Sequence, residues 1–321
     1  MFFSIFVIVL VFALSFVSTY FIDSGDPIQN VTGCGVLNTS GAVYTLNQSI
    51  DSGADGDCLI IANESMIIDC ADNNITFGNE TGGNGILNIN EATGAGYTNI
   101  TIKNCNFLDN TTAFNTTAII FGENSSDATI FNNTITTTGE EVGGMFFDIN
   151  LTNSNISSNT LIISGNSSIG ITLMAGLDTV IDSNNITIFG NLSTAIVFMN
   201  GTTYSNITLN NINISVSDSD NTTAILLIEA SNSNILYNNT ITTSGGGIVL
   251  QESTNTNLTS NTISSSVFNA SAVYLTGANS SVLEYNNITT SNNLSIAIVL
   301  TELINVLINS NDITTSNASV Q

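Results

Sequence analysis

A repeat of about 25 residues runs through most of this chain and constrains its fold more than any other feature. Each repeat carries an Asn-x-Ile triplet, whose first residue serves as an anchor: Cys105 (where Cys replaces Asn), Asn133, Asn159, Asn184, Asn210, Asn239, Asn261, Asn286 and Asn311. Three residues before each anchor stands an aliphatic residue: Ile102, Ile130, Ile156, Ile181, Ile207, Leu236, Leu258, Leu283 and Ile308. Two residues after each anchor stands another apolar residue: Phe107, Ile135, Leu161, Ile186, Ile212, Ile241, Ile263, Ile288 and Ile313. Two columns that stay apolar in every repeat predict side chains stacked along one axis.

A third apolar column comes from runs that resemble Ala-Ile-x-Leu: Ile119, Phe146, Ile171, Ile196, Ile225, Ile248, Val273 and Ile298. Each repeat thus holds three short runs of β-branched and aliphatic residues separated by polar turns, which is typical of strands. One strand per run in every coil gives three parallel sheets, with about 4.8 Å between coils. Asn suits the bend between two strands because it tolerates the left-handed backbone conformation, and stacked Asn amides can also hydrogen-bond along a ladder. The sequence therefore predicts an all-β solenoid of about ten coils, roughly 50 Å long.

At these residues the chain resembles the right-handed parallel β-helix proteins of the pectate-lyase-like superfamily, which carry an asparagine ladder. More narrowly, it is similar to the Asn- and Thr-rich β-helix proteins of archaeal cell surfaces. The resemblance covers about residues 34–321. It implies a right-handed parallel β-helix but leaves the activity open, because this scaffold hosts lyases, hydrolases, adhesins and inert surface proteins.

The segment from Phe2 to Ile22 is strongly apolar and is followed by an acidic, glycine-containing stretch. Its length suits a membrane-spanning helix and its position suits a secretory signal, although the usual basic residues before it are missing. We therefore expect export to the cell surface, with residues 1–22 acting either as a cleaved signal peptide or as a retained membrane anchor. Residues 23–75 are expected to form a disulfide-linked cap with the first coil, and residues 76–321 the β-helix repeats. Contact with a membrane is expected only through the N-terminal segment.

Sequons of the form Asn-x-Ser/Thr support export, and the chain has about 27 of them. Examples are Asn30, Asn47, Asn74, Asn99, Asn155, Asn206, Asn221, Asn257 and Asn287. Many must arise by chance in a chain so rich in Asn, Ser and Thr. Dense glycosylation therefore follows only if the host glycosylates its exported proteins.

The chain has four Cys, all before residue 106, which is an even set in a chain expected to be exported. Cys70 and Cys105 occupy similar places on neighbouring coils, and Cys34 and Cys58 flank the opening strand-like segment. We expect the pairs Cys34–Cys58 and Cys70–Cys105, with the other two connectivities left open. Packed free thiols are the alternative for Cys70 and Cys105. Cross-links at this end would help to cap a first coil that has no coil below it.

The charge balance excludes several classes of function. Lys103 is the single basic residue and His is absent, against 25 acidic residues. Nucleic acid is excluded as a partner because nothing can neutralise its phosphates, and basic patches for anionic sugars or lipid head groups are equally absent. Lyases of the resembled fold use an Arg or Lys base, and the polygalacturonase type uses clustered Asp with His and Arg or Lys. No position here matches those motifs, so no catalytic residue is carried over and no cofactor is predicted. A metal site of the zinc type is unexpected without His or a Cys-x-x-Cys motif.

Carboxylates are the remaining candidates for chemistry. An acidic column follows the third apolar column by four residues: Glu123, Glu229, Glu252 and Glu302, with Asn200 in the same place. Glu229 and Glu252 lie on successive coils, so their backbones are expected about 4.8 Å apart. Two carboxylates at that spacing can raise one pKa, bind a cation such as Ca²⁺, or act as a glycosidase pair. Side chains that splay into water from a turn are the simpler interpretation.

The outward positions of the third set of strands are apolar where a solvent-facing sheet would be polar. They are Ile120, Phe147, Val197, Leu226, Val249, Tyr274 and Val299, with Thr172 as the polar exception. A continuous apolar strip on a rod marks an association surface, so we predict lateral docking on a second copy or on another surface protein. Cover by loops or glycans of the same chain is the alternative. Asp148 interrupts the inward column, which suggests a shift of one residue around Met145–Phe147.

Together these features predict an exported, glycosylated cell-surface β-helix with a structural or adhesive role toward a protein or a glycan, and without catalytic activity. The alternative is a carbohydrate-active enzyme, a polysaccharide hydrolase or lyase, that uses the acidic column as its site.

Overall fold

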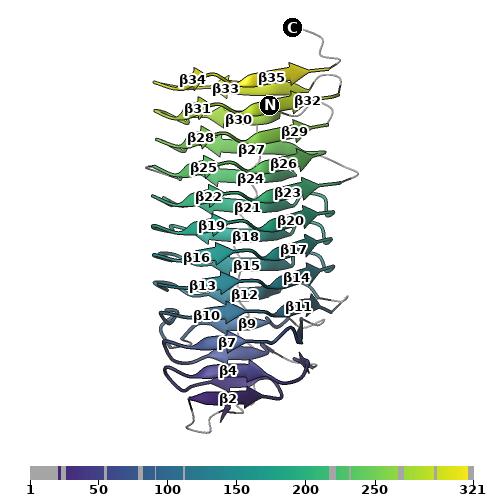
Figure 1. The fold of residues 1–321 in the computed structure, drawn as a ribbon, viewed down its shortest axis with the longest axis vertical. Coiled ribbons are helices and arrows are strands. Elements are labelled where there is room, and N and C mark those ends of the chain that lie inside the picture. Colours follow the sequence, from purple (N-terminus) through teal and green to yellow (C-terminus); the bar gives the residue numbers. More distant parts are fainter. Residues whose placement is uncertain are drawn as a thin grey trace.

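The chain is described by a computed structural model. The described residues are 21–22, 27–53, 56–78, 82–90, 92–110, 113–216, 222–230, 233–266, 271–292 and 295–316. Every regular element among them is a β-strand, and the strands stack into three parallel sheets that run the length of a rod (Figure 1). Successive strands along the chain pass from one sheet to the next, and from β3 onward each coil contributes one strand to each sheet.

The three sheets are named here A, B and C. Sheet A has 12 strands: β1 (Phe21–Ile22), β3 (Gly35–Leu37), β6 (Leu59–Ile61), β9 (Ile86–Asn88), β12 (Thr117–Phe121), β15 (Gly143–Phe147), β18 (Ile169–Met174), β21 (Thr194–Met199), β24 (Thr223–Ile228), β27 (Gly246–Gln251), β30 (Ser271–Thr276) and β33 (Ile296–Thr301). Sheet B has 12 strands: β2 (Ile28–Val31), β4 (Val43–Leu46), β7 (Ile67–Asp69), β10 (Thr101–Lys103), β13 (Thr129–Phe131), β16 (Asn155–Ser157), β19 (Val180–Asp182), β22 (Asn206–Thr208), β25 (Ile235–Tyr237), β28 (Asn257–Thr259), β31 (Val282–Glu284) and β34 (Leu307–Asn309). Sheet C has 11 strands: β5 (Ile50–Asp51), β8 (Asn74–Phe77), β11 (Asn106–Asp109), β14 (Thr134–Thr137), β17 (Thr160–Ile163), β20 (Asn185–Ile188), β23 (Asn211–Ile214), β26 (Thr240–Thr243), β29 (Thr262–Ser265), β32 (Asn287–Thr290) and β35 (Asp312–Thr315). The predicted solenoid of three parallel sheets is confirmed.

Inward side chains stack in continuous columns, as the repeat predicted. In sheet B, Ile156 lies in register between Ile130 and Ile181, and all three side chains are fully buried. The same columns end in the last described coil, where Ile308 is 41% and Ile313 is 45% exposed because no described coil packs on them. Aliphatic burial along one axis is therefore the main stabilising contact of the rod.

The third apolar column is shifted by one residue in one coil, as Asp148 suggested. Met145 lies in register between Ile119 and Ile171 and is buried, so Met145 holds the inward position. Phe147 is also inward and fully buried, whereas Phe146 lies between them on the half-buried outward side. The assignments of Phe146 to the inward column and of Phe147 to the outward strip are therefore wrong.

A small buried residue precedes the inward position in this coil as in its neighbours. Gly144 precedes Met145 in the position that Gly170 fills one coil later, and both residues are buried. A Cβ atom at Gly144 would lie 2.4 Å from the carbonyl oxygen of Gly170, so a side chain there would require the neighbouring coil to shift. Ala118 and Ala195 hold the same position before Ile119 and Ile196, so the small residue marks the register without being restricted to glycine.

The asparagine ladder lies at the sharp turn between sheets B and C. Asn159 is typical: its Nδ2 donates to the carbonyl oxygen of Ile130 (2.9 Å) and to Oδ1 of Asn184 (3.0 Å). Its backbone N–H donates to the same Oδ1 (2.9 Å), and its own Oδ1 accepts from the N–H and the Nδ2 of Asn133 (3.0 Å each). Each buried amide thus pairs with the coils on both sides, as a buried polar group requires.

The ladder asparagines hydrogen-bond along the stack as expected, but they do not themselves form the left-handed bend. None of the ladder residues has the left-handed conformation; the residue before each of them does, with φ between 52° and 58°. These residues are Asn104, Asn132, Ser158, Ser183, Leu209, Asn238, Ser260, Tyr285 and Ser310. Hydrogen bonding along the ladder therefore selects the buried asparagine, and the preceding residue makes the bend.

Shorter inward ladders of serine and threonine lie at the other turns, and the sequence analysis did not identify them. At the turn before sheet A, the N–H of Ser168 donates to Oγ of Ser193 (3.0 Å). At the turn before sheet B, Thr179 donates from its N–H to Ser205 Oγ (3.2 Å), and Ser205 donates to Oδ1 of Asn234 (3.0 Å). These buried side-chain oxygens accept hydrogen bonds from backbone N–H groups at the turns, where the sheets provide no partner.

Two disulfides join neighbouring coils at the N-terminal end. Cys34 bonds to Cys58, and Cys70 bonds to Cys105, so both predicted pairs are confirmed. The first pair links the starts of β3 and β6 in sheet A, and the second links the ends of β7 and β10 in sheet B. Cys105 also begins the ladder, because its N–H donates to Oδ1 of Asn133 (3.0 Å).

Candidate functional site

The acidic column lies at the turn from sheet A to sheet B. Glu229 follows β24 and Glu252 follows β27, and both have the left-handed conformation with φ of 51°. The N–H of Glu229 donates to the carbonyl oxygen of Gln251 (2.9 Å), and that of Glu252 to the carbonyl oxygen of Thr276 (2.8 Å). The two glutamates therefore do stand on successive coils at one turn.

The side chains of Glu229 and Glu252 are both exposed. Within the described residues neither carboxylate forms a hydrogen bond or an ion pair, and no cluster of three or more His, Cys, Asp and Glu could hold a metal ion. Two carboxylates alone would leave most of the six to eight oxygen ligands of Ca²⁺ to water. Ca²⁺ binding or catalysis by Glu229 and Glu252 thus stays a prediction. The structure shows two exposed carboxylates on successive coils at one turn.

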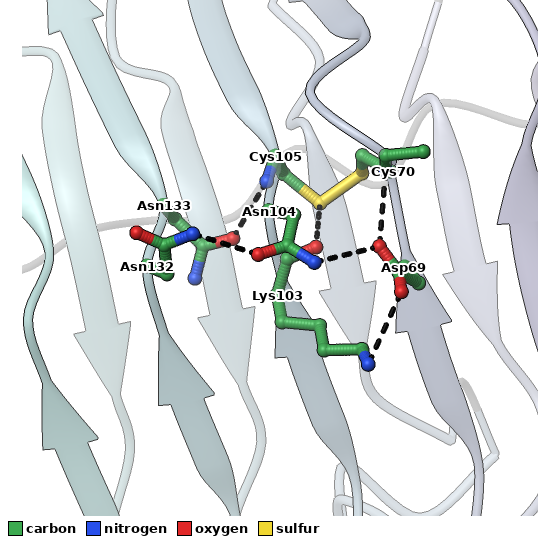
Figure 2. A network of polar contacts seen from close by, with 8 residues as sticks. Asp69, Cys70, Lys103, Asn104, Cys105, Asn132 and Asn133 are labelled. Atoms are coloured by element: carbon green, nitrogen blue, oxygen red, sulfur yellow. Dashed lines mark hydrogen bonds and ion pairs between the residues drawn. A yellow bond between two sulfur atoms is a disulfide. The ribbon is translucent and has the colours of Figure 1, made fainter.

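Lys103, the only basic side chain of the chain, is engaged in a structural cluster on the outer face of sheet B. Its Nζ lies 3.1 Å from Oδ2 of Asp69 on the neighbouring strand β7. Oδ1 of Asp69 accepts from the side chain of Asn104 (2.9 Å) and from the N–H of Ala71 (3.0 Å). Figure 2 shows this cluster beside the Cys70–Cys105 disulfide.

The electrostatics of this cluster favour the ionised carboxylate. Partial burial opposes ionisation of Asp69, but hydrogen bonds from Asn104 and Ala71 and the charge of Lys103 together hold the pKa of Asp69 below its ordinary value of 3.8. Lys103 therefore serves as the partner of Asp69 rather than as an isolated base.

The outward side of sheet A carries the apolar strip that the sequence predicted, apart from Phe147. Ile120 and Val197 are only 1% and 2% exposed, and both lie outside the continuous core cluster. Farther along the rod four half-buried side chains stand in register on neighbouring strands: Leu226, Val249, Tyr274 and Val299. These four residues are called the sheet A ridge below.

Sequons and ladder positions do not coincide. Every sequon asparagine among the described residues is exposed or half-buried, whereas each ladder asparagine is followed two residues later by Ile or Leu and so does not begin a sequon. Asn221 lies outside the described residues. Sheets B and C carry sequons at outward strand positions: Asn155, Asn206, Asn257, Asn185, Asn213 and Asn287. No described strand of sheet A contains one.

Three exposed tyrosines on and beside sheet B were missed by the sequence analysis. Tyr237 is the last residue of β25, Tyr285 directly follows β31, and Tyr204 lies two residues before β22. The signal was present in the sequence, because each replaces the Asn, Asp, Ser or Thr that most coils carry at the same place. An exposed aromatic ring offers a flat apolar face with a polar hydroxyl at its tip.

The predicted signal peptide or anchor lies outside the described residues, apart from Phe21 and Ile22 in β1. In the part of the chain that the structure describes, no helix has the length and apolar character needed to cross a bilayer.

The sequence has no match among known protein families, and no curated protein matches it. Several solved structures are similar in fold. Among them are the mannuronan C-5 epimerase A-module of Azotobacter vinelandii (TM-score 0.51, 12% identity, covering 92% of this chain and 89% of that one), the DFA-IIIase of Arthrobacter chlorophenolicus A6 in complex with GF2 (0.55, 12%, 89% and 81%), and a tailspike protein of E. coli bacteriophage HK620 in complex with a hexasaccharide (0.53, 12%, 90% and 58%). All are right-handed parallel β-helix proteins, and the fold that the resemblance implied is confirmed.

Proposed function

We propose that this chain is an exported, non-catalytic rod that acts at the cell surface in a structural or adhesive role, through contacts of its outer faces with glycans or proteins. The observation that carries the proposal is the outer surface itself. It combines an apolar ridge on sheet A with exposed tyrosines near sheet B, on a rigid stack cross-linked by two disulfides. Disulfides of this kind form and persist outside the cytoplasm, which supports export.

Neutral glycans fit the surface better than anionic ones. The tailspike and the DFA-IIIase were solved with a hexasaccharide and with GF2 bound, and the third neighbour is named for mannuronan. This chain has a net charge of −24, and its one lysine is paired with Asp69, so an anionic polymer would be repelled. Tyr237 and Tyr285 provide aromatic faces on which uncharged sugar rings can stack.

Glycosylation of the rod itself belongs to the same proposal. Turn residues such as Asn132, Asn150 and Asn238 begin sequons and stand exposed in the left-handed conformation. We expect glycans there, because the side chains are exposed to solvent. Mass spectrometry of the protein from its host would establish export, processing and glycan occupancy together. An unmodified protein found only in the cytoplasm would contradict the proposal.

The adhesive role is tested by rebinding. We expect the purified protein to fractionate with the cell envelope and to rebind to stripped envelopes, with binding reduced at least tenfold in Tyr237→Ala/Tyr285→Ala if the ligand is a neutral glycan. Thr242→Ala, on the outer face of sheet C, is the matched control. Prior oxidation of envelope glycans with periodate, or digestion with protease, distinguishes the two ligand classes. A protein that neither fractionates with envelopes nor rebinds to them would rule out the role.

The enzyme alternative has a separate test. Glu229 and Glu252 are the candidate pair, so hydrolase or lyase activity of the wild type on a polysaccharide panel should vanish in both Glu229→Gln and Glu252→Gln if the pair is catalytic. We expect no turnover by the wild type. Reproducible turnover that either substitution abolishes would replace the non-catalytic proposal with the enzyme.

A further inference from the structure

We propose that the outer face of sheet A between β24 and β33 docks on the same face of a second copy of this chain. The inference rests on the proposed surface role in one respect only: crowding at a cell surface would supply the concentration at which copies meet. A second copy of the chain is thus the partner that we infer for the outer face of sheet A.

The shape of this face fits a second copy of itself. The bulky sheet A ridge runs beside a second outward row on the same strands, in which Thr223, Gly246 and Ser271 are small and only the last residue, Ile296 on β33, is large. A ridge next to a shallow row is self-complementary under a two-fold axis, because each ridge can lie over the small row of the other copy. Both copies also share the spacing of about 4.8 Å between coils, so the contacts repeat from strand to strand. A partner without this repeat would match only one or two strands.

The chemistry of this face also allows two copies to meet. None of the outward residues of β24, β27, β30 and β33 is charged, so contact between two copies would bury no charge despite the strongly acidic composition. The nearest acids, Glu229, Glu252 and Glu302, stand exposed at the turn beyond the strand ends and can stay in water. Outward strand positions of sheets B and C carry sequons, and those of sheet A do not. Sheet A is thus the one face that glycans on the strands would leave bare.

The area of this face indicates how strong the contact can be. Four strands at about 4.8 Å by six residues at about 3.3 Å give a face of about 400 Å² per copy, or about 800 Å² in total. That lies below the standard interface of about 1,600 Å², in the range of transient complexes. We therefore infer a weak dimer that forms as the concentration rises. Salt should strengthen it, because screening reduces the repulsion between two chains of net charge −24.

Sedimentation equilibrium of the protein as its host produces it tests the inference. We expect a concentration-dependent dimer, and at least a tenfold weaker association in Leu226→Asp/Val249→Asp. The matched control is Thr242→Asp/Ser264→Asp, which adds the same charge to two paired outward positions of sheet C. It should dimerise as the wild type does, apart from a small effect of charge. A wild type that stays monomeric at all concentrations, or equal loss in both variants, would overturn the inference.

A cross-linking experiment does not depend on the aspartate variants folding. All four native cysteines are in disulfides, so Val249→Cys introduces the only free thiol. A bismaleimide long enough to reach from one ridge to the other should give a covalent dimer of Val249→Cys in most of the protein and little dimer of Thr242→Cys. Equal yields for the two would contradict docking on sheet A. Envelope rebinding by a strictly monomeric protein would overturn the dimer alone, whereas absence from the envelope would overturn the proposed function alone.

Discussion

Each ladder asparagine links three coils through its side chain and backbone. Asn184 donates its Nδ2 to the carbonyl oxygen of Ile156 (2.9 Å) and to Oδ1 of Asn210 (3.0 Å), and accepts from the N–H of Asn159 (2.9 Å). All of these atoms are buried, so no water can replace a lost partner. An unpaired buried polar group costs about 1–3 kcal/mol, more than the net gain from a typical hydrogen bond.

Asn184→Ala should therefore lower the free energy of unfolding by about 3 kcal/mol, because it leaves a donor and an acceptor of neighbouring coils without partners. The measurement is urea denaturation followed by circular dichroism. Asn185→Ala, at the next and exposed position, is the control and should change the stability by less than about 0.5 kcal/mol. Similar losses in both would mean that the ladder contributes nothing specific.

The Asp69 cluster makes a small contribution to stability that depends on pH. The pKa of Asp69 is depressed in the folded chain, so its ionised form stabilises the fold above the unfolded pKa, and this contribution is lost as the pH falls through the folded pKa. Asp69→Asn should lower the urea midpoint near pH 7, and the difference from wild type should disappear toward about pH 2. Asp178→Asn, at an exposed turn, is the control. A difference that stays constant with pH would contradict the linkage.

At the scale of the single turn, the backbone conformation explains which residues recur. The residue before each ladder position is left-handed, a conformation that costs most residues about 1–2 kcal/mol and asparagine or glycine much less. Leu209 occupies such a position with φ of 55° and an exposed side chain. Its side chain gains little by burial, so the turn between β22 and β23 is under backbone strain.

Leu209→Asn should accordingly raise the free energy of unfolding by about 1 kcal/mol through relief of this strain. Urea denaturation measures the change. Ile235→Asn is the matched control, because Ile235 is an exposed aliphatic residue within strand β25, where asparagine is disfavoured and no stabilisation is expected. If Leu209→Asn is neutral or destabilising, the apolar contact of Leu209 outweighs its conformation.

The sequence predicted the strands well and one strand register incorrectly. Regular spacing from the Asn-x-Ile triplets located the strands of sheets B and C, because one inward residue per strand recurs at a fixed distance from the anchor. In β15 two phenylalanines follow one methionine, so hydrophobicity alone did not distinguish the inward residue from the outward one. Only pairing with Ile119 and Ile171 placed Met145 inward, and with it Phe146 outward.

At the scale of the whole molecule, identical residues contribute differently according to the coils around them. Ile181 and Ile308 belong to the same column of sheet B, but Ile181 is fully buried between two coils and Ile308 is not. In a solenoid each coil contacts only its neighbours, so stability depends on nearest-neighbour contacts.

Ile181→Ala should lower the free energy of unfolding by about 3 kcal/mol, since it leaves a cavity between packed coils. The same substitution at Ile308 should cost about 1 kcal/mol, because its side chain is already partly exposed. Thermal and urea denaturation of the two variants provide the comparison. Equal losses would indicate that the last described coil is covered in solution by another part of the chain or by a partner.

The sequence by itself determined the solenoid, its apolar columns except at β15, and the hydrogen-bonded asparagine ladder, and it favoured both disulfide pairs without excluding the other connectivities. The repeat runs along one dimension, so a fixed spacing of apolar residues is enough to specify which side chains stack. The tertiary structure decided what depends on contacts across coils and faces. It showed the inward position of Met145, the pairing of Lys103 with Asp69 and the different exposure of outward residues such as Val197 and Val249. Those properties arise from what packs beside a residue rather than from its place in the repeat, and a one-dimensional pattern does not contain that information.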